Sequence, residues 1–327
     1  MKLKISKLIK KDIRRLEIYL SEFSGKLDGI LGEAVESILT TGGKRIRPAL
    51  FFICAKNEKY DLEYLLPAAA SIEIIHTASL IHDDIIDNSS LRRGGKTIHN
   101  IYNKDVAKFV GNYLFTHTFS LLNYYKNSEI LEEMSNAAQN LVKGEFDQIK
   151  TKWGLDQDED IYFKKINKKT SSLFEVSCVL GAILSNSKQE DIKNLRKFGK
   201  YFGISYQIND DISDINIRKT LKINGKPICN DIRQGNITLP LIYALKNEKF
   251  KNEFKSILNK KVIIDRDLKK ILFMISKNGA VKLAQEKFCY YLYKAEKIIS
   301  SVRGMERREG LIKLCDNFKQ GIKRSFL

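Results

Sequence analysis

Apolar residues recur at intervals of three and four along most of the chain, which is the pattern of amphipathic α-helices. The alternation typical of β-strands is nearly absent. The pattern predicts helices near residues 5–22, 28–40, 47–56, 62–88, 104–125, 128–151, 158–186, 189–214, 238–256, 265–277, 279–302 and 305–323. Only four prolines occur, without an internal repeat or a Gly/Ser/Pro-rich linker. The sequence therefore predicts an all-α fold in a single domain over residues 1–327.

The stretch least like a helix is 216–236, which is basic and is interrupted by glycine and proline. It follows the helix predicted at 189–214 and is expected to be a loop that closes over a site. The longest wholly apolar run, residues 49–55, is too short to span a bilayer. The N-terminus alternates lysine with single apolar residues, so a secretory signal is not expected.

Lys and Arg total 57 against 39 Asp and Glu, which gives a formal net charge of +18. This charge favours an anionic partner, such as a nucleic acid, a membrane surface or a phosphorylated small molecule, although excess lysine also aids solubility. The basic residues are scattered without interleaved aromatics, so nucleic-acid binding is not expected. The five cysteines are widely spaced and lack a C-x-x-C pair. This argues against disulfides and structural zinc and favours the cytoplasm.

Two clusters of aspartate carry the strongest chemical signal. They are Asp83, Asp84 and Asp87, and Asp210, Asp211 and Asp214. Residues three and four apart lie on one face of a helix, so each cluster gathers like charges and requires a cation. Mg2+ is typically held by carboxylates together with substrate phosphates. One cluster alone is also typical of a solvated helix end, but the repeat within apolar helices predicts a cavity in which Mg2+ clamps a departing diphosphate.

Basic motifs lie on either side of the first cluster. They are Lys44, Arg45 and Arg47 within Gly42-Gly-Lys-Arg-Ile-Arg-Pro48, and Arg92 and Arg93 after the aspartates. The first motif is predicted at a helix N-terminus, where anions are favoured, and paired arginines can donate paired hydrogen bonds to phosphate. Both segments are also compatible with solvated turns. A nucleotide-binding P-loop is excluded, because Ser90 replaces the first glycine of G-x-x-x-x-G-K-[ST].

Six motifs follow one another along the chain. They are GGKRIRP (42–48), HTASLIHDDIID (76–87), RRG (92–94), Lys169-Thr170, QINDDISD (207–214) and GKPICNDIRQGNITLP (225–240). In this order and spacing they resemble the all-trans isoprenyl diphosphate synthase family. LGEA (31–34), YDLE (60–63) and RQGNITLP (233–240) are similar to component II of bacterial heptaprenyl diphosphate synthase. The resemblance implies an isoprenoid-synthase-like bundle of long antiparallel helices around a central cavity.

The resemblance also implies a prenyltransferase that joins isopentenyl diphosphate head to tail to an allylic diphosphate, with farnesyl diphosphate as the expected primer. Mg2+, at about three ions per active site, and Arg92 would draw off diphosphate and leave an allylic carbocation. The isopentenyl double bond would attack it, and the departing diphosphate would take up the proton. The implied metal ligands are the six aspartates of both clusters. The implied catalytic residues are Asp83, Asp84, Asp87, Lys169, Thr170, Gln207 and Asp210.

Substrate binding is assigned by the same resemblance. Isopentenyl diphosphate would be bound by Lys44, Arg47, His76 and Arg93. The allylic diphosphate would be bound by Arg92, Lys169, Thr170, Gln207 and Lys226. Asn112 and Asn236 depart from the family pattern, in which many members carry Asp and Lys. The other histidines, His82, His99 and His117, are expected to be packing residues.

Ser79 and Ala78 precede Asp83 by four and five residues, about one helical turn or ~5–6 Å. Short-chain members place a bulky aromatic residue at one of these positions, so the resemblance implies a tunnel that is open past Ile75 and Ile72. We predict a product of C30 to C40, with heptaprenyl (C35) first, for a quinone side chain such as that of menaquinone. Ala78→Phe is expected to shorten it to about C15 to C20. So long an apolar tail favours contact with a membrane.

Other functions stay open at this point. A terpene cyclase also ionises a diphosphate with Mg2+, but GGKRIRP and RRG favour a second, isopentenyl site. A shorter-chain farnesyl or geranylgeranyl synthase and a non-catalytic regulatory subunit are further alternatives, and two intact aspartate clusters argue against the latter. The chain is expected to work as a homodimer or as a heterodimer with a small regulatory subunit.

Overall fold

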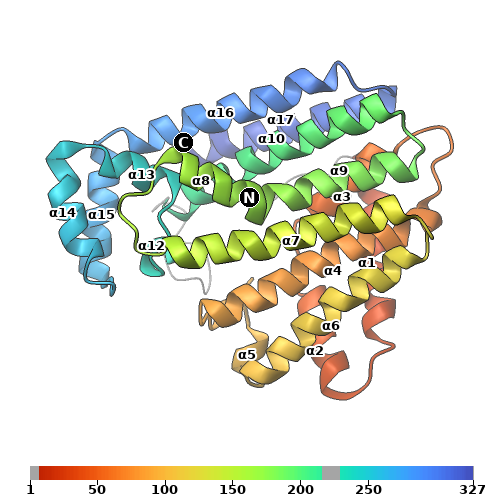
Figure 1. Ribbon diagram of the computed structural model, residues 1–327, viewed down its shortest axis with the longest axis horizontal. Coiled ribbons are helices and arrows are strands. Elements are labelled where there is room, and N and C mark those ends of the chain that lie inside the picture. Colours follow the sequence, from red (N-terminus) through yellow and green to blue (C-terminus); the bar gives the residue numbers. More distant parts are fainter. Residues whose placement is uncertain (1–6, 216–228, 327) are drawn as a thin grey trace.

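The computed structural model describes residues 7–215 and 229–326, and the all-α prediction is confirmed (Figure 1). The helices are α1 (Lys10–Ser24), α2 (Gly29–Thr40), α3 (Ile46–Ala55), α4 (Leu62–Ile86), α5 (Ile98–Ile101), α6 (Lys104–Asn123), α7 (Ser128–Thr151), α8 (Glu159–Ile166), α9 (Ser172–Leu184), α10 (Gln189–Asp214), α12 (Asn230–Arg233), α13 (Leu239–Leu245), α14 (Glu248–Leu258), α15 (Asp265–Lys277), α16 (Ala280–Ile299) and α17 (Met305–Phe326). A 3-10 turn, Lys7–Ile9, precedes α1, and a π-helix, Asn167–Ser171, joins α8 to α9.

The long helices pack side by side, and α14 and α15 lie at one end against α13 (Figure 1). α4 packs on α6, α9 packs on α3 and α10, and α10 packs on α16. One connected hydrophobic core extends from Ile9 to Phe318. Burial of an apolar face in this core stabilises each helix far more than its intrinsic propensity does.

α4 lies in the centre and carries the first aspartate cluster at its C-terminal end. Among the described residues, it is the one helix that is long and apolar enough to cross a membrane by length and composition. However, 72% of its most apolar window is buried inside the molecule. A buried core helix passes the same test, so the composition of α4 is weak support for a membrane span.

Pro67 lies inside α4 without ending it. The Tyr125 hydroxyl donates to the Tyr64 carbonyl oxygen at 2.6 Å and accepts from the Ala68 amide at 3.1 Å. The hydroxyl is therefore inserted between two groups that would otherwise bond directly in a helix, next to the proline that perturbs the turn. α4 continues from this turn to the aspartates.

The structure corrects three predicted boundaries. The helix predicted at 158–186 is divided by the π-helix, and the helix predicted at 238–256 is divided into α13 and α14. The apolar spacing continues across both breaks, so the sequence pattern did not reveal them. In the loop predicted at 216–236, Asn230–Arg233 forms the helical turn α12, and 216–228 lie outside the described residues.

A small hairpin contains the paired arginines Arg92 and Arg93 and sets their orientation. It consists of β1 (Leu91–Arg92) and β2 (Gly95–Lys96), which pair antiparallel. The two turn residues, Arg93 and Gly94, have φ of 53° and 88°, as a type I′ turn requires. The hairpin folds Arg92 back toward α4.

Glu175 on α9 gives a pH-dependent stability. Burial raises its pKa to about 7, and the nearby charges of Lys200 and Arg196 offset this only in part. The folded state therefore holds the proton more tightly than the unfolded state. The resulting stability is complete below about pH 4 and is lost as the pH rises through 7. We expect Glu175→Gln to be about 1–2 kcal/mol more stable than the parent at pH 8, with no gain near pH 4.5.

Urea unfolding at the two pH values measures this effect. The matched control is Glu190→Gln, because the Glu190 side chain is 73% exposed. It is expected to change the free energy of unfolding by less than about 0.5 kcal/mol at either pH. An equal effect of both substitutions, or no gain for Glu175→Gln at pH 8, contradicts the burial argument.

Candidate active site

Two cavities lie side by side between the helices. The acidic cavity, of about 500 Å³, is lined by Asp83, Asp87, Asp211, Asp214 and Asp231 among others. The basic cavity, of about 510 Å³, is lined by Lys44, Arg47, His76 and Arg93 among others. The residues common to both linings are Leu80, Asp83, Arg92, Lys169, Thr170 and Gln207. Ligands in the two cavities would therefore meet at this shared wall.

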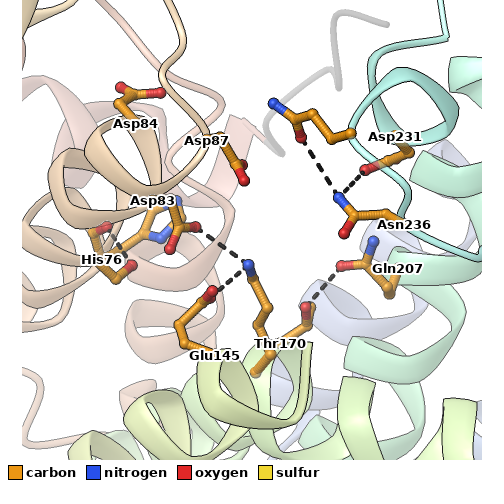
Figure 2. Close-up of polar contacts among 12 residues, drawn as sticks. His76, Asp83, Asp84, Asp87, Glu145, Thr170, Gln207, Asp231 and Asn236 are labelled. Carbon is orange, nitrogen blue, oxygen red and sulfur yellow. Dashed lines mark hydrogen bonds and ion pairs between the residues drawn. The ribbon is translucent and has the colours of Figure 1, made fainter. Parts of the chain in front are cut away.

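The first aspartate cluster points in two directions. Asp83 and Asp87, one helical turn apart, both line the acidic cavity. Asp84 is 3% exposed, and one of its oxygens accepts a hydrogen bond from Arg92 Nε at 2.6 Å. Figure 2 shows Asp84 turned away from the other two carboxylates. The structure thus brings two of the three aspartates to the cavity and pairs the third with Arg92.

Cations also accompany the two aspartates at the cavity. Lys169 Nζ lies 3.4 Å from Asp83 Oδ2 and also contacts Glu145 on α7 (Figure 2). Lys152 Nζ lies 2.9 Å from Asp87 Oδ1. Burial and the neighbouring Asp83 raise the pKa of Glu145 to about 7, although Lys169 opposes the shift. Each carboxylate of the cluster therefore has an ammonium or guanidinium partner.

The second aspartate cluster divides between the cavities. Asp210 lines the basic cavity, and Asp211 and Asp214 line the acidic one. Asp211 accepts hydrogen bonds from the Tyr162 hydroxyl at 2.6 Å and from Gln207 Nε2 at 2.8 Å. Burial raises the pKa of Asp211 to about 7. Its oxygens are thus occupied by neutral donors from the protein.

Thr170 and Gln207 join the π-helix to α10. The Thr170 hydroxyl donates to Gln207 Oε1 at 2.6 Å (Figure 2). A π-bulge is a frequent feature of functional sites, because it redirects side chains without ending the helix. Gly144 on α7 permits close approach, since a Cβ there would lie 2.5 Å from the Lys169 amide nitrogen. This packing sets Lys169 and Thr170 into the shared wall.

The segment around α12 closes one side of the acidic cavity. Asn236 Nδ2 donates to Asp231 Oδ1 at 3.2 Å (Figure 2), and the Asp231 amide donates to Asp214 Oδ2 at 3.3 Å. Burial and the neighbouring Asp231 raise the pKa of Asp214 to about 7. Across from this segment, the Trp153 amide donates to the Gly235 carbonyl at 2.8 Å.

The basic cavity holds a neutral histidine. Burial, with the charges of Arg47 and Arg93, holds the pKa of His76 well below its usual range. Arg47 Nη1 lies 3.1 Å from His76 Nε2. Because a guanidinium can only donate, Nε2 is the acceptor and Nδ1 carries the hydrogen. The cavity therefore presents the positive charges of Arg47 and Arg93 beside a neutral histidine, with Glu73 and Asp210 on the same lining.

Arg45 has a different role from its neighbours. It is 3% exposed, and its guanidinium bonds to Glu17 at 2.7 Å and to Glu73 at 2.5 Å. These ion pairs tie the 42–48 motif to α1 and α4. Both Arg45 and Lys44 line the basic cavity, but Arg45 is held by carboxylates, whereas Lys44 Nζ lies 5.6 Å from the Tyr206 ring centroid.

Comparison with known proteins gives the family. The profile described as "Polyprenyl synthetase" matches residues 28–275. The chain belongs to the polyprenyl synthetase family. It is 37% identical over 279 residues to "Heptaprenyl diphosphate synthase component 2" of Bacillus subtilis (strain 168), over 85% of this chain and 79% of that protein. It is 40% identical over 223 residues to the protein of the same name from Geobacillus stearothermophilus, over 68% of this chain and 69% of that protein.

Solved structures agree with this family. The polyprenyl synthase of Caulobacter crescentus CB15, complexed with calcium and isoprenyl diphosphate, has a TM-score of 0.88 and 26% identity, and 97% of this chain and 98% of that chain are covered. The heptaprenyl diphosphate synthase of Staphylococcus aureus has a TM-score of 0.86 and 29% identity, with 97% and 98% covered. This polyprenyl synthetase is therefore a trans-polyprenyl diphosphate synthase with the isoprenoid synthase fold, and the predicted prenyltransferase activity is confirmed.

The acidic cavity fits the divalent metal that polyprenyl synthetases use. Asp83 Oδ1 is buried and has no hydrogen-bond partner, which leaves a carboxylate oxygen for a hard cation. Within residues 7–215 and 229–326, however, no three His, Cys, Asp or Glu side chains are grouped to hold an ion by themselves. Complete metal coordination in this synthase thus requires side-chain movement or oxygens from a substrate phosphate.

The remaining residues singled out in the sequence differ in where they lie relative to the two cavities. Lys226 lies outside the described residues. Ser79 lines the basic cavity, whereas Ala78 is fully buried and is absent from both linings. Asn112 is exposed on α6. The metal, catalytic, substrate and chain-length roles of the individual residues stay predictions.

The packing expected of the histidines is seen in two cases. His82 packs on Gly111 of α6, where a Cβ would lie 2.6 Å from its Nε2. His117 stacks on Phe23 with ring centroids 4.4 Å apart.

Sequence reasoning missed several residues of the synthase site. They are Glu145, Lys152, Tyr162, Lys165 and Asp231, of which Lys152 alone is outside the cavity linings. Asp231 stands within GKPICNDIRQGNITLP, so the motif carried a signal for it. The others stand in ordinary amphipathic helices or beside them, and only tertiary packing brings them to the aspartates.

Gly235 allows the α12 segment to lie against Trp153, the only tryptophan of the chain. Its φ is +76°, and a Cβ would lie 2.2 Å from the indole ring. Gly235→Ala is therefore expected to lower the free energy of unfolding by about 2–5 kcal/mol, from backbone strain together with overpacking. Urea unfolding monitored by Trp153 fluorescence measures the loss.

Gly279→Ala is the matched control for Gly235→Ala. Gly279 has a similar φ of +74°, but a Cβ there would meet nothing within 4 Å. Gly279→Ala should therefore lower the free energy of unfolding by the backbone strain alone, about 1–2 kcal/mol. Equal losses in the two variants would rule out the steric contact with the indole.

Proposed function

We propose that this synthase condenses isopentenyl diphosphate with an allylic diphosphate across the shared wall of its two cavities. The observation that carries the proposal is the adjacency of an acidic and a basic cavity, with Asp83, Lys169 and Gln207 lining both. A diphosphate held through metal ions suits the acidic cavity, and a diphosphate held directly by cations suits the basic one. Two substrates held in this way have their reacting carbons brought together.

The basic cavity binds isopentenyl diphosphate in this proposal. Arg47 and Arg93 donate to its phosphates, with Lys44 at the exposed side. His76 stays neutral at pH 7 because of its lowered pKa. Its Nε2 accepts from Arg47, which fixes the direction of the guanidinium.

The acidic cavity binds the allylic diphosphate. Bound Mg2+, at about three ions, would neutralise and polarise the departing diphosphate. Asp83, Asp87 and Asp214 supply carboxylate oxygens, and Asp210 approaches from the basic side. Lys169 and Gln207 donate to the phosphate oxygens at the wall, and Thr170 positions Gln207 by donating to its Oε1. Arg92 is held by Asp84, and the contribution of Lys226 rests on the resemblance alone.

We also propose a product of C30 to C40, with heptaprenyl (C35) first and farnesyl diphosphate as the primer. Ser79 supports this, since a small residue lines the cavity one turn below Asp83. The relatives named heptaprenyl diphosphate synthase component 2 support it as well. We propose that a product of this length serves as a quinone side chain, such as that of menaquinone.

The synthase is proposed to assemble as a homodimer or with a small regulatory subunit. Val142, Phe146 and Ile149 form an exposed apolar stripe on α7, with exposures of 46%, 58% and 45%. Phe109 on α6 is 69% exposed. Apolar surface of this kind is typical of subunit contacts, and "component 2" in the names of the two relatives supports a partner.

A cytoplasmic location with peripheral membrane contact completes the proposal. The cysteines are free thiols, four of them buried, which suits a reducing compartment. The long apolar product and the net charge of +18 favour an anionic lipid surface.

Release of diphosphate tests the reaction class. With Mg2+, farnesyl diphosphate and isopentenyl diphosphate together, we expect steady release that EDTA abolishes. Release from farnesyl diphosphate alone, at the same rate, would indicate a terpene cyclase. No release under any of these conditions, with or without a partner subunit, would favour a non-catalytic subunit.

A further inference from the structure

Lys165 on α8 is a buried lysine that the proposed mechanism does not use. The residue is 6% exposed and lines the acidic cavity. Its Nζ donates to Gln157 Oε1 at the long distance of 3.4 Å. Among the described residues this is the one hydrogen bond of the ammonium, which has three hydrogens to donate, so most of its capacity is unused there.

The neighbouring lysines differ from Lys165 in having carboxylate partners. Lys168 Nζ lies 2.7 Å from Asp147, and Lys169 contacts Asp83 and Glu145. Within residues 7–215 and 229–326, no such ion pair is formed by Lys165. A buried ammonium without a close anion is costly, so its retention in a cavity wall points to a ligand that completes it.

The two carboxylates whose charge acts most strongly on Lys165 already accept hydrogen bonds from other residues. Asp211 and Asp231 are the acids whose charge acts most strongly on it. Asp211 is bonded by Tyr162 and Gln207, and Asp231 by Asn236. Lys165 is thus not required to satisfy them, although it lines the same cavity as both.

We propose that Lys165 binds a phosphate oxygen of the allylic diphosphate, as a second ammonium beside Lys169 on the same wall. The inference rests on the proposed function and adds a residue that the sequence motifs did not indicate. Lys165 lies four residues before Lys169, across the start of the π-helix, and both line the acidic cavity. Asn236, on the same lining, is neutral, so Lys165 supplies to this cavity a positive charge that Asn236 does not.

The test uses Lys165→Met in the full chain, with farnesyl thiodiphosphate as a non-reactive probe in the presence of Mg2+. Isothermal titration should show the Kd of the probe rising about tenfold to a hundredfold, which is the range for losing a charged hydrogen bond. The KM for isopentenyl diphosphate should change less than about twofold, because the basic cavity has its own cations. Lys165→Arg should recover most of the lost affinity.

Lys164→Met is the matched control, because Lys164 is the exposed neighbour on the same helix. It should leave the Kd of the probe unchanged. Equal Kd values of the probe for Lys165→Met and Lys164→Met would overturn the inference. So would an equal rise, in Lys165→Met, of the Kd of the probe and the KM for isopentenyl diphosphate, because it would indicate a structural role for Lys165. If Lys165→Met does not fold, Lys165→Gln replaces it with the same expectations. Failure of the parent chain to bind the probe, both alone and with a partner subunit, would instead contradict the proposed function itself.

Discussion

Asp83→Asn is expected to lower kcat by about two to three orders of magnitude and to raise the Mg2+ concentration required for half-maximal rate. Among the described residues, Asp83 is the one carboxylate that lines both cavities, and its buried Oδ1 has no hydrogen-bond partner there. Its other oxygen lies 3.4 Å from Lys169 Nζ. The substitution would thus remove a proposed metal ligand and loosen a lysine that is proposed to bind phosphate. Initial rates over a range of Mg2+ concentrations measure both effects.

Two further variants make the Asp83 result specific. Asp105→Asn is the control, because the Asp105 side chain is 80% exposed at the start of α6, and it should be silent. Asp211→Asn should alter thermal stability more than the Mg2+ dependence, since Tyr162 and Gln207 occupy its oxygens. An Asp83→Asn enzyme with the parent's Mg2+ dependence would remove Asp83 from the metal site.

Ser79→Phe is expected to shorten the main product from about C35 to about C15 to C20. Ser79 lies one turn below Asp83, which lines both cavities, so an aromatic ring there would limit the space beneath the shared wall into which the growing chain is predicted to extend. Ala78→Phe was predicted to act alike, but Ala78 is fully buried. A ring at that position must also displace packed neighbours, at about 1–3 kcal/mol. Reversed-phase chromatography of labelled products reads the length.

Ser79→Ala is the control for product length and should keep the parent's distribution. If Ser79→Phe and Ala78→Phe both fold and both give the parent's ladder, the growing chain does not pass these positions. A shortened product from Ala78→Phe alone would place the chain on the buried side of α4.

The helices were predictable because apolar spacing directly reflects which face of a helix is buried. Residues 62–88 were predicted as a helix, and α4 spans Leu62–Ile86. The π-helix was not predictable, because one extra residue per turn changes hydrogen bonding while the apolar spacing continues. The break between α13 and α14 was not predictable either, because the apolar spacing also continues across it.

The aspartate clusters were predictable from spacing, but their partners were not. Spacing places Asp84 and Asp211 beside their neighbours in each cluster. In the structure, Asp84 accepts a hydrogen bond from Arg92. Asp211 accepts one from the hydroxyl of Tyr162, a residue 49 positions away in the chain. Such pairings depend on how helices pack, which a single sequence does not show. Glu145 and Lys165 enter the site for the same reason.

Incubation of the purified chain alone with Mg2+, farnesyl diphosphate and labelled isopentenyl diphosphate tests the central claim most directly. The account predicts labelled prenyl diphosphates, read by chromatography as a ladder that ends between C30 and C40. Activity that appears only with a small partner subunit would assign the chain to a heteromeric synthase and keep the two-cavity mechanism. No elongation under either condition would contradict the claim that the adjoining acidic and basic cavities form a working prenyltransferase site.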